Sequence, residues 1–431
     1  MSTRAVRALL VVAVLLAGAC SSDGESGPGP LPTAPDSARV DLVVPEFPNP
    51  TEITNPLFPM SELTQAVRLG TEGDTPVRVE FTVLPGTRTI DWNGKQVETR
   101  IAQFLAFREG RILEAARNYF AQGADGSVWY FGEDVDRYED GVVAGHEGAW
   151  LAGRDGPPGM IMPATPVAGA VYRPENIPGV VFEEVTVTAV DETVEGPRGP
   201  VDGVVLVRAL SMDGATADKA FAPGYGEMRA SAVDEQVATA VAAPVDVLPA
   251  PMPDQLTGLY SGAVLVYETV PLGDWDRIAT VLDSMTASWA ALVAGGGSPQ
   301  SLQAEMNRAL AGLVVGAPTR KGQAVSRAAL DVARAALDLQ MQYRPVAQID
   351  ADRLLLWARA IRIDVADDDP AAVRSDVAAA GWVWDRVRPT VDPAGATEVD
   401  GQLAELRQKA GGKDLAAAAA TAQTLVATLQ R

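Results

Sequence analysis

Five carboxylates lie within eight residues of one segment of the chain: Glu133, Asp134, Asp136, Glu139 and Asp140. Oxygen-rich segments can hold calcium, but this spacing does not follow the EF-hand pattern. Paired carboxylates can also cleave a glycosidic bond when they flank the sugar and one of them has a raised pKa. Adjacent residues of a strand point to opposite faces, so Glu133 and Asp134 are poor partners. We favour an acidic hairpin turn, and keep a calcium site and a carboxylate-dependent hydrolase as alternatives.

A second group of residues has the chemistry of a soft-metal site. Met160 and Met162 would share one face of a strand, and the only histidine, His146, lies nearby in sequence. Thioethers and imidazole suit copper(I). Methionines beside an isoleucine more often fill a hydrophobic core, and we favour that interpretation. Metal handling, with calcium or with copper, stays open as an alternative.

Few residues remain for nucleophilic or zinc-dependent catalysis. Cys20 is the only cysteine and His146 the only histidine, so the chain has neither a Cys/His couple with a free thiol nor a zinc hydrolase pattern. It has no G-x-S-x-G segment that would present a serine nucleophile. The glycines at 295–297 end a helical pattern and do not follow a strand, unlike a nucleotide-binding loop. We expect a non-enzymatic protein without a cofactor.

Cys20 has a chemistry of its own, because it follows a short export signal. Two arginines precede the apolar stretch at residues 9–16, which is too short to span a bilayer stably. The segment LAGAC, residues 16–20, resembles the lipobox of bacterial lipoproteins, in which the cysteine after the cut is acylated. It differs from the usual pattern in having Ala17 where leucine is common. We predict a signal peptide at 1–19 and a lipid anchor on Cys20.

The overall composition restricts the partners of the protein. The chain has 56 acidic and 35 basic residues and a net charge of −21, so it repels phosphate backbones and we expect no nucleic-acid partner. Hydrophobic residues make up 47% of the sequence, enough for the cores of two or three domains. Arginine greatly outnumbers lysine, a bias typical of a high-GC bacterium such as an actinobacterium.

Residues 40–231 have the pattern of an antiparallel β domain. Apolar and polar residues alternate from 77 to 83 with the period of two of a half-buried strand. Further strands are expected near 180–190 and 201–210. Hairpin dipeptides recur at even spacing: Asn93-Gly94, Glu109-Gly110, Asp125-Gly126 and Asp140-Gly141. We predict a meander that curls into a sandwich or a half-barrel.

Aromatic residues are frequent in this β region, among them Tyr119, Trp129, Phe131 and Trp150. If the sheet closes incompletely, they line an apolar trough that can carry a hydrophobic ligand. If it closes fully, they pack in an ordinary core. We favour the packed core and keep the trough as an alternative.

The remainder of the chain has a helical pattern. Residues 232–255 contain several prolines without clear periodicity and are predicted to form a linker. Residues 256–431 show amphipathic periods, such as Ile278, Leu282, Met285 and Trp289. We predict six or seven antiparallel helices, in a bundle or a stack of helical hairpins. Their starts are expected at capping residues: Asp274, Ser298, Thr319, Asp350, Asp369 and Asp414.

Several sequence strings resemble a group of secreted and lipid-anchored bacterial proteins with no assigned biochemical activity. In the β region these are NYFAQ, DGSVWYFGED, YEDG, AGRDGPPGMIM and FAPGYGE, at residues 118–122, 125–134, 138–141, 152–162 and 221–227. The helical region is similar to a domain that accompanies it in actinobacterial lipoproteins, through DLQMQYRP at 338–345 and IDADRLLLW at 349–357. The resemblance implies a location and a domain layout, and implies no catalytic residues.

Together these patterns predict an α+β protein with two segregated domains. Its parts are the signal peptide 1–19, a lipidated cysteine and tether at 20–39, the β domain 40–231, the linker 232–255 and the helical domain 256–431. We expect a binding or assembly role at the cell envelope. The partners expected are the membrane, through the lipid, and either a hydrophobic small molecule or an envelope protein. The hydrolase alternative would act on envelope carbohydrate.

Overall fold

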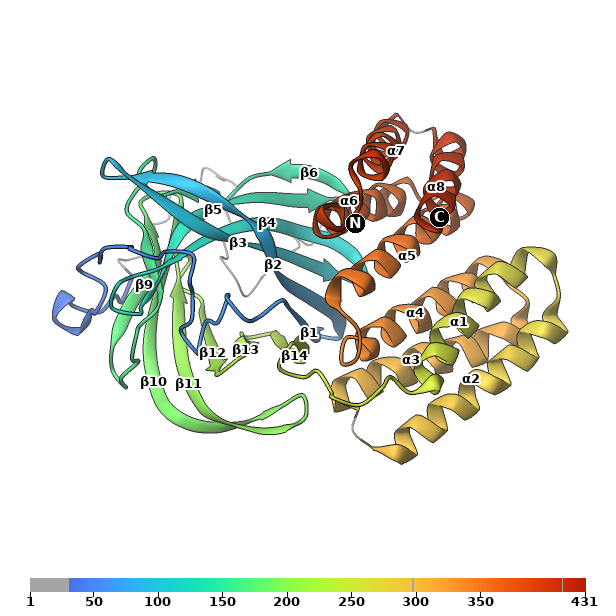
Figure 1. Cartoon of the computed structure of the whole chain (residues 1–431), viewed down its shortest axis with the longest axis horizontal. Helices are drawn as coiled ribbons and strands as arrows, with labels where there is room; N and C mark the ends of the chain where they lie inside the picture. The colour runs from blue at the N-terminus through green and yellow to red at the C-terminus, as the bar shows by residue number, and fades with distance from the viewer. Residues whose placement is uncertain (1–30, 297, 413) are drawn as a thin grey trace, which may run out of the picture. The chain divides into compact units, whose positions relative to one another are not determined.

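The computed structural model describes residues 31–296, 298–412 and 414–431. They form two compact units (Figure 1): a β unit up to residue 239 and a helical unit from residue 240, which also includes residues 110–113 and 138–143. All of the β-strands named below lie within 65–243 and all of the α-helices within 254–429. The expected two segregated domains are therefore confirmed. The predicted signal peptide and Cys20 lie outside the described residues.

The β unit is built on one antiparallel sheet in which most neighbouring strands are also consecutive along the chain. The order is β6-β5-β4-β3-β2-β1-β14-β13-β12-β11-β10-β9, and β7 and β8 both pair with β5. The strands are β1 (Gln65–Glu72), β2 (Thr75–Trp92), β3 (Lys95–Arg108), β4 (Arg111–Gln122), β5 (Val128–Glu139), β6 (Val142–Gly145), β7 (Trp150–Leu151), β8 (Gly159–Met162), β9 (Val171–Ile177), β10 (Val181–Gly196), β11 (Gly199–Ser211), β12 (Thr216–Ala222), β13 (Gly226–Ser231) and β14 (Glu235–Ala243).

Turn chemistry explains the regular meander. Asn93 and Gly94 connect β2 to β3 with φ angles of 52° and 76°, the left-handed conformation that a two-residue hairpin requires at both positions. Three further predicted dipeptides likewise lie between β3 and β4, between β4 and β5, and between β5 and β6. The hairpins expected from the sequence are therefore confirmed.

The sheet curves strongly (Figure 1), and strand β8 lies between β5 and β9. At one end β8 pairs with β5, and the backbone of β8 passes so close to β9 that a Cβ on Gly159 would lie 2.0 Å from the carbonyl oxygen of Pro174. Only glycine permits this approach. The β unit is thus one curved antiparallel sheet and not a two-sheet sandwich. Its core includes Trp129, Trp150 and Tyr172.

The helical unit contains eight described α-helices joined by short connections. Helices α5 to α8 share one core, which includes Leu354, Val377, Leu403 and Leu425. The helices are α1 (Asp254–Thr269), α2 (Trp275–Gly295), α3 (Gln300–Gly316), α4 (Gly322–Gln340), α5 (Val346–Ala366), α6 (Pro370–Val387), α7 (Pro393–Gly411) and α8 (Leu415–Leu429). Short 3-10 helices lie at Asp36–Ala38, Val270–Leu272, Ala317–Thr319 and Arg388–Thr390.

The sequence prediction was wrong at several places. Ser298 and Thr319 do not cap helices, because the N-caps of α3 and α4 are Pro299 and Lys321. Residues 235–243, placed in the linker, form strand β14, which lies between β13 and β1 in the sheet. Its pairing with β1, which is far away in sequence, is a contact that a local pattern does not reveal.

Helix α1 begins at Asp254, inside the predicted linker. The described part of the chain has eight α-helices, where six or seven were expected. Asp350 does not begin a helix: it lies inside α5, where its carboxylate pairs with Arg353 at 2.8 Å.

That buried ion pair extends between helices. Arg353 also lies 2.7 Å from Asp338 of α4, and Arg386 of α6 lies 3.4 Å from Asp350. The two helical strings quoted from the sequence, at 338–345 and 349–357, therefore meet through their charged residues. The charged residues of the two strings therefore have a structural role, which the sequence alone did not indicate.

Among the described residues, α2 is the one helix long and apolar enough to cross a membrane by length and composition. Ile278, Leu282, Met285 and Trp289 are its buried residues, as their spacing predicted. The rest of the helix is mostly exposed and includes Asp276, Arg277 and Asp283. The helix thus has the one-sided packing of an amphipathic helix.

Candidate functional site

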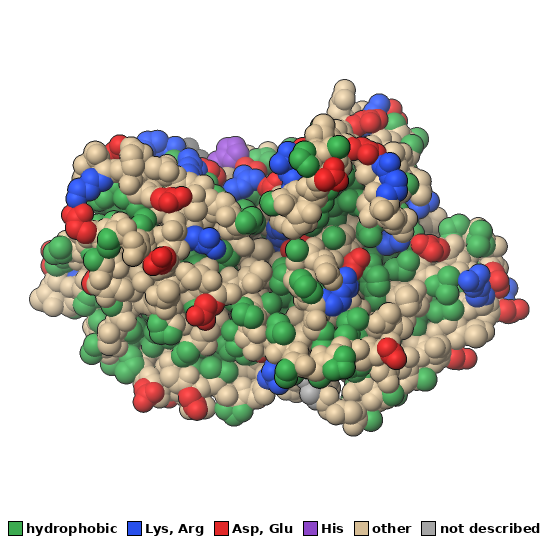
Figure 2. Space-filling view, in the orientation of Figure 1, with side chains coloured by type: hydrophobic (Ala, Val, Ile, Leu, Met, Phe, Trp, Pro, Cys, Tyr) green, Lys and Arg blue, Asp and Glu red, His purple; other side chains and the backbone are tan. Residues whose placement is uncertain are grey.

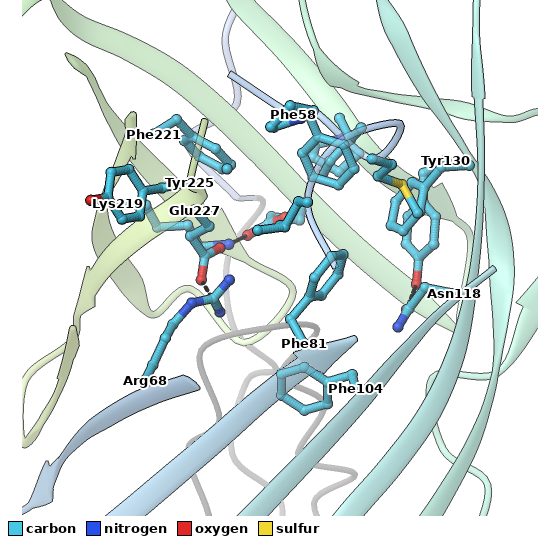
Figure 3. Close-up of a pocket in the computed structure, with 18 of the residues that line it drawn as sticks. Phe58, Arg68, Phe81, Phe104, Asn118, Tyr130, Lys219, Phe221, Tyr225 and Glu227 are labelled. Atoms are coloured by element: carbon cyan, nitrogen blue, oxygen red, sulfur yellow. Dashed lines mark hydrogen bonds and ion pairs between the residues drawn. The ribbon is translucent and has the colours of Figure 1, made fainter. Parts of the chain in front are cut away.

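A pocket lies on the inner face of the curved sheet (Figure 3). Its cavity volume is about 70 Å³. The whole empty space between its walls, including the part open to solvent, is about 740 Å³. It is therefore a narrow space that can hold a few water molecules or a slender apolar group. The walls are mainly apolar, and the aromatic side chains among them are Phe58, Phe81, Phe104, Phe120, Tyr130, Phe221 and Tyr225.

One wall of the pocket is a segment without regular strand structure, residues 53–63. It carries Phe58 and Met60 into the interior, where both are buried. Asn55 holds this segment across the sheet, because its side-chain amide donates to the carbonyl oxygens of Gly126 and Pro163, each at 3.1 Å. The ring of Phe58 packs edge-on against Phe120, with ring centres 4.9 Å apart.

Two buried ion pairs form the polar wall. Arg68 of β1 lies 2.9 Å from Glu227 of β13, and Lys219 of β12 lies 2.5 Å from Glu183 of β10. Figure 3 shows Arg68, Lys219 and Glu227 close together on one side of the pocket. Burial lowers the pKa of Lys219, but the carboxylates of Glu183 and Glu227 outweigh it, so the net pKa is raised and the lysine stays charged.

Glu175 of β9 is the third carboxyl of the pocket and has a different environment. Its side chain is buried, and it accepts a hydrogen bond of 3.0 Å from the indole nitrogen of Trp150. Burial, reinforced by the carboxylate of Glu183, raises the pKa of Glu175 to about 8. The pocket therefore contains one neutral carboxyl beside two paired ones at neutral pH.

A second layer of acidic residues lies behind Glu175. Burial raises the pKa of Glu133 well above its ordinary value, and the charges of Glu175 and Glu114 raise it further. Burial also raises the pKa of Glu114 to about 7, although Arg137, 2.9 Å away, opposes this. Carboxyls that interact in this way titrate as a group, so their protons are shared among them.

Two further buried polar atoms belong to this region. Within the described residues, neither the Nε of Arg68 nor the hydroxyl of Tyr172 has a hydrogen-bond partner. Burial, with the charges of Glu183 and Glu227, raises the pKa of Tyr172, so its hydroxyl stays protonated. Both atoms are donors that a bound water or a ligand oxygen could satisfy.

The acidic segment singled out in the sequence is divided between two environments. Glu133 is buried, whereas the side chain of Asp134 is 53% exposed and pairs with Arg88 at 2.6 Å. Asp136 lies 3.0 Å from the exposed imidazole of His146, the purple side chain in Figure 2. No group of three or more His, Cys, Asp and Glu side chains suited to a metal occurs among the described residues. On the face in Figure 2, acidic and basic side chains are scattered and do not form one patch.

The two methionines and the histidine have different environments. Met160 and Met162 are buried in the core of the β unit, while His146 is exposed. The aromatic residues named from the sequence are likewise buried in that core: Tyr119, Trp129, Phe131 and Trp150. None of these four lines the pocket. The favoured packed core therefore describes them correctly, and different aromatic residues surround the cavity.

The polar residues of the pocket were not identified as a site from the sequence. Arg68 lies between Val67 and Leu69, and Lys219 and Glu183 each have one apolar neighbour in their strand, so a charged residue at these inward positions is unusual. That signal could have marked them individually. Their pairing joins residues far apart in the chain, Arg68 with Glu227 and Lys219 with Glu183, which no local pattern contains.

Comparison with models of known protein families finds no match to this chain. Comparison with curated proteins also finds none that is significantly similar.

Proposed function

We propose that this protein is a lipid-anchored, extracytoplasmic binding protein whose β unit holds a hydrophobic small molecule without reacting with it. The observation that carries the proposal is the narrow pocket, with its aromatic walls and a few buried polar groups on one side. Ligand pockets commonly combine apolar walls with a small number of placed polar groups that orient the ligand. The lipid on Cys20 would keep such a protein beside the membrane, where hydrophobic molecules are found.

A second candidate function is a carboxylate-dependent hydrolase. It is favoured by one observation, a neutral Glu175 near the ion-paired Glu183, because acid catalysis needs two carboxyls in different protonation states. The walls argue against a sugar chain as substrate, since aromatic and aliphatic side chains leave most sugar hydroxyls without partners. The hydrophobic ligand therefore remains our proposal.

The proposal is tested with the purified full chain. Native mass spectrometry followed by solvent extraction should reveal a co-purifying apolar molecule. After its removal, addition of 1-decanol should raise the midpoint of thermal unfolding, because a ligand that prefers the folded state stabilises it. A ligand at 100 times its Kd contributes about 2.7 kcal/mol.

A pocket-filling variant supplies the control. Ile161 lines the pocket, so Ile161→Trp should remove the response to 1-decanol. The matched variant Val190→Trp introduces the same tryptophan side chain at an exposed position of β10 and should leave the response intact. If neither the wild type nor Val190→Trp binds 1-decanol or carries an extracted molecule, the carrier function is wrong. Turnover of a glycoside that Glu175→Gln abolishes would instead establish the hydrolase.

A further inference from the structure

The charged groups of the pocket are unequal in number. Its lining contains three carboxyls, Glu175, Glu183 and Glu227, and two cations, Arg68 and Lys219. Each cation is already paired with a carboxylate, at 2.9 and 2.5 Å. Among the described residues Glu175 has no ion pair, and its one hydrogen bond comes from the uncharged indole of Trp150.

The layer behind the pocket has the same imbalance. The charge of Glu114 raises the pKa of Glu175, and the charges of Glu175 and Glu114 raise the pKa of Glu133. The cation Arg137 pairs with Glu114. An anionic ligand group would add a further negative charge to this interior. A positive group would instead reduce the repulsion among the carboxyls.

The aromatic walls add a second attraction for the same kind of ligand. Seven aromatic rings line the cavity, and Figure 3 shows those of Phe58, Phe81, Phe221 and Tyr225 around its interior. The face of an aromatic ring attracts a cation, more strongly when water is excluded. Aromatic rings beside an acidic side chain are a general arrangement for ammonium recognition.

We propose, on the basis of the proposed carrier function, that the pocket takes a hydrophobic molecule with one cationic amine, whose ammonium group pairs with Glu175 among the aromatic rings. The apolar part of the molecule lies against Phe58, Phe104 and Ile161. The amine takes the place of the proton on Glu175, so that binding releases a proton to solvent.

Binding of the amine therefore depends on pH. The groups that act on Glu175 come from five elements: Glu183 on β10, Lys219 on β12, Glu114 on β4, Glu133 on β5 and the indole of Trp150 on β7. Because Glu175 has a pKa of about 8 in the free protein, a cation competes with its proton at lower pH. The affinity should rise by up to tenfold per pH unit between pH 6 and 8.

The test compares three C10 compounds of similar size on the full chain by isothermal titration calorimetry: decylammonium, 1-decanol and decanoate. Decylammonium should bind at least tenfold more tightly than 1-decanol at pH 8, and decanoate most weakly. In Glu175→Gln, the preference for decylammonium over 1-decanol should fall below threefold and its pH dependence should disappear. Glu52→Gln, which removes one exposed acidic charge, should behave as the wild type.

The outcomes separate this inference from the carrier function. Equal binding of 1-decanol and decylammonium would leave the carrier function standing and overturn the amine. It would favour a neutral ligand oxygen that accepts from the Nε of Arg68, which lines the pocket. Tightest binding of decanoate would also overturn it, since the cations would then be the recognition groups. Absence of binding for all three compounds would contradict the carrier function itself.

Discussion

The Nζ atom of Lys219 lies 2.5 Å from Oε1 of Glu183, and their side chains are only 7% and 12% exposed. The two residues are 36 positions apart, on strands β12 and β10, which are separated by β11. Their contact is made on the concave side of the sheet, where it forms part of the pocket wall. The pair therefore connects the stability of the β unit to the chemistry of its cavity.

Removal of Lys219 should destabilise the β unit strongly. In Lys219→Met the carboxylate of Glu183 stays buried without its cation, which typically costs about 3–5 kcal/mol. The double variant Lys219→Met/Glu183→Gln should lose much less than the two single variants together, because no charge is left unpaired. Urea unfolding of the four proteins measures this.

The pair between Arg208 and Asp218 on the neighbouring strands is a suitable control. Its distance is also short, 2.8 Å against 2.5 Å for Lys219 and Glu183, but its side chains are 59% and 61% exposed. Arg208→Met should therefore cause no measurable change in stability. An equally small effect of Lys219→Met would show that the buried pair does not form in solution.

The stability of the protein should fall as the pH rises from about 4.5 to about 8. Glu175 has a pKa of about 8 when folded, against an ordinary value of 4.5, so the folded chain retains a proton that the unfolded chain has released. Stability is therefore highest below the lower value and is lost as pH rises through the upper one. Glu114, with a pKa of about 7, acts in the same direction.

Glu175→Gln removes one carboxyl that holds a proton in the folded chain and releases it on unfolding. Thermal unfolding midpoints measured at intervals from pH 5 to 9 should decline less steeply in Glu175→Gln than in the wild type, and the variant should be the more stable protein at pH 9. Glu52→Gln should retain the wild-type slope. Identical slopes in all three proteins would show that Glu175 ionises at its ordinary pKa.

Asp274 should stabilise the helical unit by capping α2. Its carboxylate accepts a hydrogen bond from the backbone nitrogen of Arg277 at 3.1 Å. Asp274→Ala should lower the free energy of unfolding by about 1 kcal/mol. Asp283→Ala, an exposed change in the middle of the same helix, should have a smaller effect in chemical denaturation. A larger loss in Asp283→Ala would contradict the capping role.

Cys20→Ser should release the protein from the membrane fraction, because the lipid is the anchor that the sequence predicts. Detergent partitioning and mass spectrometry of the mature N-terminus provide the measurement. Cys20→Ala, which also lacks the thiol, should partition in the same way. Retention of either variant in the membrane fraction would point to another attachment, and α2 would be the first segment to test.

Local features of the sequence were sufficient for the fold class. A dipeptide such as Asn93-Gly94 specifies its turn because the left-handed conformation costs it little, whatever lies elsewhere in the chain. Asp274, Asp369 and Asp414 could be identified as helix caps because the amides they accept from are only two or three residues away. These signals act over a few residues, so they are visible without the tertiary structure.

The pocket and its charged groups were decided only by the tertiary structure. Arg68 and Glu227 are 159 residues apart, and their ion pair depends on how far the sheet curves and on which strands meet at its ends. The alternation at residues 77–83 of β2 identifies two faces, but not which one closes around a cavity. The pKa of Glu175 likewise depends on burial and on charges from other strands. Turns and helix caps can be predicted from a local sequence pattern. A site enclosed by many strands forms only when long-range strand pairing has removed its residues from water.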